Sequence, residues 1–395
     1  MLNLDIVKTH FMKILSIETS CDDTGVSILE VKGGVKNPSF RVLANNLNSQ
    51  VNIHIPYGGV FPVLAKREHA KNLPILLEKS LKQVKLNKKE KPVDAIAVTY
   101  GPGLEMCLWE GITFAKDLVK KWNVPLIPTN HMEGHILSVF GKNKGTLKIE
   151  KLQTPTLALL ISGGHTQLVL MKKWMDYEII GETLDDAVGE AFDKVARMLD
   201  LPYPGGPQIS KLAEKERLAK PDASAQDFLL CNVNHSQKHT GSAKTPPIAL
   251  PRPMLRSKNF DFSFSGLKTA VLYLIRDLGG IKNISEETKS KIALEFENAA
   301  MECLVYKTAK AIETYKVKTL IVAGGVSANK YLRNEMSAIG GSASGGKKIK
   351  IYFPPKELSG DNSIMIGIAG YLNYIKNKKK FTKIKNLKAT GGLRL

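Results

Sequence analysis

The chain is poor in cysteine, and its cysteines are never closely paired. The four that occur in 395 residues form no C-x-x-C motif: Cys21, Cys107, Cys231 and Cys303. Such spacing excludes a densely disulfide-bonded scaffold and a zinc ribbon built from cysteine, and it is typical of a reducing compartment. We therefore expect a cytoplasmic protein.

Long hydrophobic runs are missing as well. No apolar run reaches the about 18 residues that a membrane-spanning helix needs, so we expect no membrane span. The opening residues MLNLDIVKTHFM lack the layout of a signal peptide. Because Met12 begins a regular apolar pattern, we predict that residues 1–11 form a loose N-terminal extension.

Acidic residues are scarce relative to basic ones. The chain has 37 Asp and Glu against 57 Lys and Arg, which gives a net charge of +20. This excess favours a polyanionic partner, nucleic acid first and an anionic membrane second, although a compositional bias towards solubility is the alternative. The lysine-rich stretch 376–388 is either a solvated end or an RNA-contacting segment.

The order of predicted elements repeats along the chain. A β-hairpin with Asp22 and Asp23 in its polar tip is predicted over 13–31, and a second hairpin with a Gly-rich tip over 154–173. Helices are predicted over 68–84, 106–122, 189–201, 290–315 and 361–375, and strands over 93–103, 124–130 and 349–355. The repetition favours two similar α/β lobes whose tips share one cleft, a common place for a nucleotide.

Two polar stretches interrupt this order. Residues 217–253 are predicted to be an insertion, and 340–348 a flexible loop. His235 and His239 are four residues apart in the insertion, but its sequence has no helical pattern. We interpret them as exposed loop residues.

The stretch NHMEGHILSVF, residues 130–140, places His131 and His135 four residues apart. On a helix both imidazoles would lie on one face, where they can bind one metal ion. The protease motif H-E-x-x-H needs glutamate directly after the first histidine, but that position holds Met132. Glu133 would point to nearly the opposite side of the helix. The pair is either a metal site or two buried, hydrogen-bonded histidines.

Asp361 lies at the start of the last predicted helix. Aspartate is a favoured N-cap, so capping is one role for it. The other is that of a third metal ligand. A His-His-Asp set with open positions suits zinc or iron(II) better than magnesium.

Three glycine pairs follow or precede predicted elements, in ISGGHTQ (161–167), YPGGP (203–207) and VAGGVSANK (322–330). Glycine lets backbone N–H groups approach phosphate or carboxylate oxygens without a Cβ in the way. Asn329 would lie near a helix start, where anions are often bound. Plain tight turns are the alternative, but their repetition beside polar tips favours nucleotide binding.

Motifs from end to end of the chain match one family. In order they are IETSCDDTG, YGG, GPGL, NHMEGH, SGGHTQL, GEAFDK, YPGGP, FSFSGLKT, AGGVSAN and DNSIM. Over about residues 12–375 the chain resembles the bacterial-type tRNA threonylcarbamoyladenosine synthesis transferases, the TsaD group, formerly labelled sialoglycoprotein endopeptidases. The resemblance implies the two-lobed actin/sugar-kinase/heat-shock ATPase-like fold, with duplicated ribonuclease-H-like lobes around a nucleotide cleft. We assign 12–150 with 360–395 to the first lobe and 151–359 to the second.

The resemblance also implies a reaction and its partners. The threonylcarbamoyl group of threonylcarbamoyl-AMP would pass to the exocyclic amine of an adenosine beside the tRNA anticodon, with release of AMP. A smaller paralogous subunit and a P-loop ATPase subunit are the implied protein partners. The alternatives are a non-enzymatic nucleotide-binding scaffold and a metalloprotease.

Site residues carry over by motif. His131, His135 and Asp361 match the positions that hold one divalent metal, iron(II) or zinc. The positions that match the nucleotide and acyl contacts are Leu160, Ile161, Ser162, Gly163, Gly164, Asp193, Gly206 and Asn329. Asp22 is the candidate catalytic residue. The chain departs from the family at Val63, usually glutamate, at Gly360, commonly threonine, and in the bulkier stretch GLEMCLWEG.

Overall fold

The computed structural model describes residues 11–34, 37–87, 90–150, 152–219, 248–342, 349–377 and 386–395. Nearly all of the expected N-terminal extension, most of the insertion with His235 and His239, and much of the loop 340–348 lie outside these ranges. Within them, no helix is long and apolar enough to cross a membrane.

The first sheet is mixed. Three consecutive strands form an antiparallel meander, and two later strands add in parallel beside the first. The strands are β1 (Met12–Glu18), β2 (Asp23–Lys32), β3 (Ser39–Ser49), β4 (Ala95–Gly101), β5 (Leu126–Asn130) and the edge strand β6 (Gly145–Lys148). Their spatial order is β5-β4-β1-β2-β3-β6.

The second sheet repeats this connectivity. Its strands are β7 (Thr156–Ile161), β8 (Thr166–Lys173), β9 (Asp176–Glu182), β10 (Thr319–Ala323) and β11 (Lys350–Tyr352). The order is β11-β10-β7-β8-β9, again an antiparallel meander followed by two parallel additions beside its first strand. The duplicated α/β fold expected from the sequence is confirmed, whereas the lobe boundaries stay a prediction.

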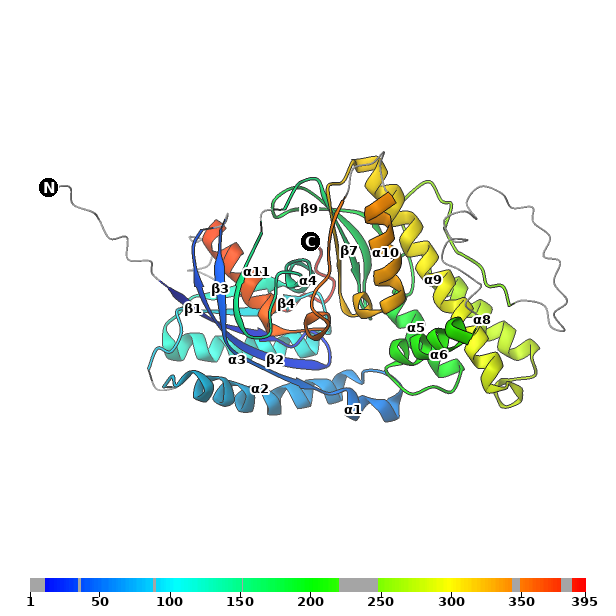
Figure 1. Ribbon diagram of the computed structural model, residues 1–395. Coiled ribbons are helices and arrows are strands. Elements are labelled where there is room, and N and C mark those ends of the chain that lie inside the picture. Colours follow the sequence, from blue (N-terminus) through cyan, green and yellow to red (C-terminus); the bar gives the residue numbers. More distant parts are fainter. Residues whose placement is uncertain are drawn as a thin grey trace.

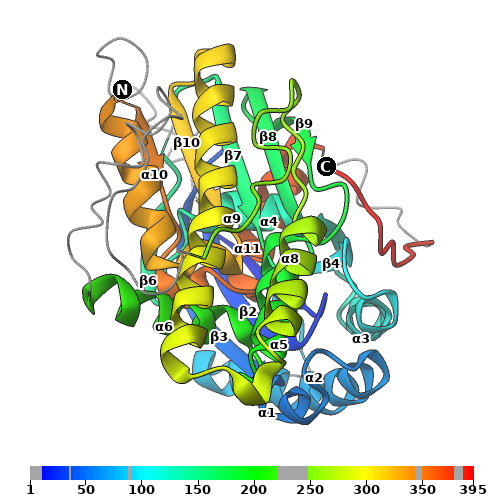
Figure 2. The same cartoon turned by 90° about the vertical axis from the view of Figure 1, so that its right-hand side faces the viewer.

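The helices form three layers around the two sheets (Figure 1). Helices α2 (Pro62–Val84) and α3 (Glu105–Trp122) cover the outer face of the first sheet. Helices α4 (His131–Ser138) and α11 (Ser363–Lys376) share one core with strands of both sheets. The outer face of the second sheet packs on α5 (Val188–Met198), α6 (Gly205–Ala219), α8 (Ser265–Asp277), α9 (Glu286–Tyr315) and α10 (Lys330–Ser342). Figure 2 shows α8 and α9 over this face.

The remaining described elements are short. They are α1 (Val51–His54), η1 (Ile55–Tyr57), η2 (Ile281–Asn283), η3 (Gly325–Ala328) and η4 (Lys356–Leu358).

Strand β7 shows why the layers form. Its residues alternate between two cores: Leu157, Leu159 and Ile161 face the outer helices, while Ala158 and Leu160 face α4 and α11. Successive strand side chains point to opposite faces, so a strand covered on both faces reads as a continuous apolar run. The central helices are thus enclosed by two sheets.

The C-terminal segment 386–395 is a correction to the sequence analysis. A solvated or RNA-contacting end was expected through residue 388, but Leu387 is 7% exposed and belongs to the core around α2 and α3. Thr390 N donates to Tyr100 O at 2.9 Å, which holds the segment along the end of β4. Packing on the first lobe therefore orders this part of the tail.

Candidate metal and nucleotide site

Helix α4 begins where β5 ends, and a side chain fixes that junction. The Asn130 Oδ1 atom accepts hydrogen bonds from Met132 N at 2.8 Å and Glu133 N at 3.3 Å. This N-cap satisfies two backbone donors that the helix itself leaves unpaired. It starts the helix at His131, so His131 and His135 lie one turn apart on the same face.

Asp361 meets the two histidines. Its Oδ1 atom lies 3.3 Å from His131 Nε2 and 3.2 Å from His135 Nε2, and the two Nε2 atoms are 3.1 Å apart. Asp361 is not the N-cap of α11, because the Asn362 side chain performs that role by accepting from Met365 N at 3.0 Å. Of its two expected roles, the structure supports that of a ligand.

The spacing of these three donors fits a small metal ion. Donors placed tetrahedrally at about 2.0–2.2 Å from zinc lie roughly 3.3–3.6 Å from one another, close to the distances found. The histidine side chains are only 7% and 1% exposed, whereas that of Asp361 is 20% exposed. A ligand would therefore reach the ion from the Asp361 side. Two imidazoles and one carboxylate suit zinc or iron(II).

The charges around this group favour a cation. Burial favours neutral His131, but the negative charges of Glu18 and Asp361 outweigh it and raise the pKa of this imidazole to about 10. Burial opposes ionisation of Asp361, yet the charge on His131 holds the pKa of that carboxyl well below its ordinary value. Burial lowers the pKa of His135. The charge of His131 also lowers the pKa of Glu18 despite its burial, so Glu18 and Asp361 both stay ionised and attract positive charge.

Glu133 faces away from the histidines, as expected from its position on the helix. Its Oε1 atom accepts a hydrogen bond from the Tyr177 hydroxyl at 3.1 Å, and Oε2 accepts one from Asn373 Nδ2. A glutamate held in this way cannot act on water at the His-His-Asp group. The geometry speaks against the metalloprotease alternative.

The turn between β7 and β8 contains the first glycine pair. Ser162 N donates to His165 O at 2.8 Å, and His165 N donates to Ser162 Oγ at 3.1 Å. Leu160 and Ile161 are buried in β7, so they contribute backbone rather than side chain to any site. A Cβ added at Gly163 or Gly164 would meet nothing within 4 Å. These glycines are not required by crowding. They are not required by backbone conformation either, because neither has a positive φ.

Gly324, by contrast, is required by the fold. Its φ is +94°, and a Cβ there would lie 2.4 Å from Ile161 O, because β10 runs beside β7. Gly206, in the first turn of α6, resembles Gly163: nothing lies within 4 Å of its absent Cβ. At these open glycines no side chain stands between the backbone and a ligand, although the Gly206 N–H is already bonded to Asp193.

Asp193 and Asn329 are tied into the second lobe. The Asp193 Oδ1 atom accepts from Gly205 N at 2.7 Å, at the start of α6. Asn329 Nδ2 donates to Ser210 Oγ and to Glu297 Oε1, both at 2.8 Å. Its Oδ1 accepts from Leu332 N at 2.8 Å, so, as the sequence predicts, it lies at the start of a helix, α10.

The acids of the first hairpin tip interact electrostatically with Asp361 and with Asp193. Burial, followed by the charge of Asp361, raises the pKa of Asp22, and the same causes raise the pKa of Asp23 to about 7. Burial raises the pKa of Asp193, and the charge of Asp22 adds to that shift. The tip of the first lobe thus lies within electrostatic reach of Asp361 and of the α5–α6 junction.

Two residues near the metal group were not predicted from the sequence. Burial and then the charges of His131 and His135 lower the pKa of His165 to about 4. Glu18 Oε2 lies 3.0 Å from His131 Nδ1. The signals were present: His165 follows a glycine pair directly, and Glu18 places a charge at the end of an apolar strand.

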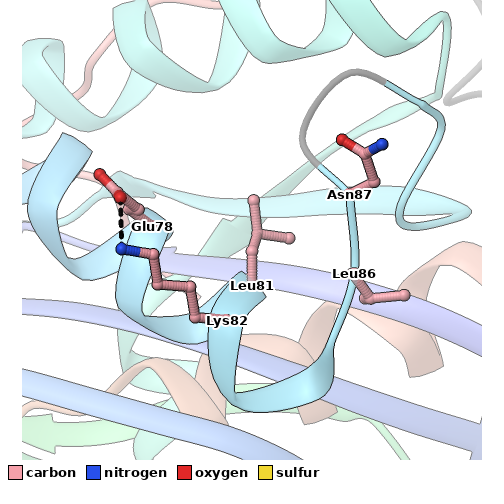
Figure 3. Close-up of a pocket in the computed structure, with 5 residues that line it drawn as sticks. All are labelled: Glu78, Leu81, Lys82, Leu86 and Asn87. Carbon is pink, nitrogen blue, oxygen red and sulfur yellow. Dashed lines mark ion pairs between the residues drawn. The ribbon is translucent and has the colours of Figure 1, made fainter.

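Two surface pockets lie elsewhere. One, at the end of α2, is lined by Glu78, Leu81, Lys82, Leu86 and Asn87 (Figure 3). The other is lined by Leu152, Gln153, Thr154 and Lys318. Neither contains a candidate site residue, and Glu78 and Lys82 form an ion pair of 2.7 Å along α2 beside the first. We do not assign the site to either.

Two sheets of the same connectivity, with a His-His-Asp group in the helical layer between them, define a duplicated α/β protein. The family model described as TsaD, tRNA N6-adenosine threonylcarbamoyltransferase, matches residues 41–368. The chain belongs to this family, and it is an enzyme of the transferase class.

Curated relatives carry the same name, tRNA N6-adenosine threonylcarbamoyltransferase. The one from Chromobacterium violaceum is 42% identical, over 91% of this chain and 92% of its own. That from Thermosipho africanus is 38% identical, over 97% and 100%. That from Staphylococcus epidermidis is 42% identical, over 93% of each chain. A solved HypF structure is 14% identical, with a TM-score of 0.47 over 94% of this chain and 47% of that one.

Proposed function

We propose that the chain transfers the threonylcarbamoyl group of threonylcarbamoyl-AMP to the exocyclic amine of an adenosine next to the tRNA anticodon, with release of AMP. The observation that carries this proposal is the meeting of His131, His135 and Asp361 in a chain of this family. Their ligand atoms all lie within 4.8 Å of one another.

The three side chains would hold one divalent ion, zinc or iron(II). When bound, the ion supplies positive charge that stabilises the phosphate of the leaving AMP. Two imidazoles and one carboxylate leave positions free for that phosphate.

The second lobe would bind the nucleotide and acyl parts of the donor. Gly163 and Gly164 are exposed and open on the side where a Cβ would lie, so their backbone would be able to approach phosphate or carboxylate oxygens. Gly206 lies in the first turn of α6, where the Asp193 carboxylate accepts from the N–H groups of Gly205 and Gly206, so Gly206 would allow close backbone approach rather than supply a free donor. Asn329 and Asp193 would act mainly by shaping this surface, since each is engaged by protein groups.

Asp22 is our candidate for the residue that accepts a proton from the attacking amine. Burial raises its pKa, which makes the ionised carboxylate a stronger base than an exposed aspartate. The target adenine must leave its stack to reach the cleft, as in other enzymes that modify bases.

The proposed partners are tRNA, a smaller paralogous subunit and a P-loop ATPase subunit, in the cytoplasm. The charge of +20 supports the first. Exposed apolar side chains on α1, on the segment that follows it, and at the starts of α2 and α3 would contact a protein subunit. They are Ile53, Ile55, Tyr57, Phe61, Val63, Met106 and Trp109.

The test is mass spectrometry of tRNA nucleosides after incubation with threonylcarbamoyl-AMP, with the two candidate subunits added stepwise. Threonylcarbamoyladenosine that requires this chain supports the proposal. Its absence with all partners present would favour the scaffold alternative. If the chain cleaved a protein substrate and Glu133→Gln abolished that cleavage, the result would favour the metalloprotease alternative.

A further inference from the structure

Glu18 is a buried charge beside the proposed metal site. It ends β1, and its side chain has no solvent exposure. Such a carboxylate is costly unless hydrogen bonds and an opposite charge compensate it. The ion pairs of the described residues give it no lysine or arginine partner, only His131.

Hydrogen bonds occupy both of its oxygens. Oε1 accepts from Ser20 N at 2.6 Å, and Oε2 accepts from the Thr99 hydroxyl at 2.6 Å. Oε2 also lies 3.0 Å from His131 Nδ1, and the Ser20 hydroxyl lies 3.2 Å from the same nitrogen. A carboxylate can only accept, so it favours a proton on Nδ1. The other ring nitrogen, Nε2, is the one that faces Asp361.

We propose that Glu18 is a positioning residue for the metal: it fixes the tautomer and orientation of His131 and places a buried negative charge behind this ligand. The inference rests on the metal site of the proposed function. Carboxylates that hold ligating histidines in this way act on both ring orientation and ligand basicity. His135 lacks an equivalent, because its buried Nδ1 has no hydrogen-bond partner in the described part of the chain. Of the two histidines, only His131 is therefore held by a carboxylate.

Glu18→Gln is the discriminating substitution, since neither orientation of the new amide fits. With its oxygen towards His131, its NH₂ group meets the Ser20 N–H. With the NH₂ group towards His131, the Nδ1 atom must accept and Nε2 then carries the proton, which blocks the metal. We expect the dissociation constant for zinc alone, measured by competition with a chromophoric chelator, to rise about 10- to 100-fold.

Glu133→Gln is the matched control. Glu133 is also a buried glutamate and lies on the metal-binding helix, but it contacts Tyr177 and Asn373. Its zinc affinity should stay within about twofold of the wild type, because it makes no contact with the ligands. Unchanged zinc affinity in Glu18→Gln, or equal loss in both variants, would overturn the inference.

A measurement on the wild type guards against a variant that does not fold. Long-range proton–nitrogen spectra of the zinc-loaded chain with ¹⁵N-labelled histidine should show His131 protonated at Nδ1. Protonation at Nε2 would overturn the inference. If the wild type binds no zinc, the metal site of the proposed function fails as well, whereas normal wild-type binding with an unaffected Glu18→Gln variant removes the positioning role alone.

Discussion

At the residue scale, two neighbouring polar side chains before α11 have different tasks. Asp361 faces the histidines, while Asn362 caps the helix and also donates to Leu358 O and Gly360 O. We predict that Asp361→Ala loses bound metal and activity but stays folded. Asn362→Ala should keep the metal and lose about 1 kcal/mol of unfolding free energy. Elemental analysis and urea unfolding measure the two effects, and full metal content in Asp361→Ala would refute the ligand assignment.

Substitutions at the glycines should also separate an effect on ligand binding from an effect on folding. The Gly163→Ala and Gly206→Ala variants should fold normally, because their new methyl groups meet open space. If the AMP phosphate contacts the backbone there, the added methyl group should weaken AMP binding at least about tenfold. Gly324→Ala should instead lower the thermal midpoint, because of its positive φ and the nearby Ile161 O. Normal AMP affinity in both of the first two variants, measured by calorimetry, would place the nucleotide elsewhere.

Asp23 makes metal-free stability depend on pH. Burial and the charge of Asp361 raise its folded-state pKa to about 7, from an ordinary value of 3.8. The folded state therefore binds the proton more tightly, so this group lowers stability as pH rises from about 4 to 7. Asp23→Asn, which stays uncharged, should gain stability relative to the wild type by about 1–3 kcal/mol above pH 7. Thermal melts in a chelator, at both ends of this range, test it; an equal difference at the two ends would contradict it.

At the scale of elements, the C-terminal segment connects the two lobes. Asn130, the cap of α4, donates through Nδ2 to Arg394 O at 3.2 Å. The Arg394 guanidinium reaches Glu182 of β9 at 2.8 Å. Lys116 of α3 also binds Leu387 O at 2.8 Å. The C-terminal segment thus contacts the cap of the helix that bears both histidines. Deleting 376–395 would therefore not isolate an RNA effect.

Burial of Leu387 should make this segment stabilising. We predict that Leu387→Ala lowers the unfolding free energy by about 2–3 kcal/mol, because it leaves a cavity beside α2 and α3. Lys388→Ala, at the exposed neighbour, should change it by less than about 0.5 kcal/mol. Urea unfolding measures both, and equal effects would mean that the segment is not docked in solution.

At the scale of the whole molecule, the charge of +20 predicts salt-dependent RNA binding. The logarithm of the association constant for tRNA should fall linearly with the logarithm of the salt concentration. The slope should be about −0.7 to −0.9 per phosphate contacted, because neutralised phosphates release counterions. Changing the lysines between 378 and 385 to glutamine removes five charges, at Lys378, Lys379, Lys380, Lys383 and Lys385, and leaves 386–395 in the chain. A weaker affinity and flatter slope would assign RNA contact to this stretch. An unchanged slope would assign it to another surface.

Much of the fold was predictable, because strands and helices follow from local patterns of apolar residues. The hairpin over 13–31, the helix ending at Val84 and the long helix ending at Tyr315 all agree with the structure. Strand β3 and helix α8 were not predicted. The apolar residues of β3 can be assigned to a strand only once its pairing with β2 is known. Those of α8 can be assigned to a helix only once the core of the second lobe is known.

The sequence by itself determined the repeated order of elements, the one-turn spacing of the two histidines and the family to which the chain belongs. Each of these depends on residues close together in the chain or on motifs in order. Only the tertiary structure decided that Asp361 meets the histidines while Asn362 caps α11, that Glu18 lies behind His131, and that the C-terminus docks. These contacts join distant segments, and they form because two sheets enclose α4 and α11 in one core.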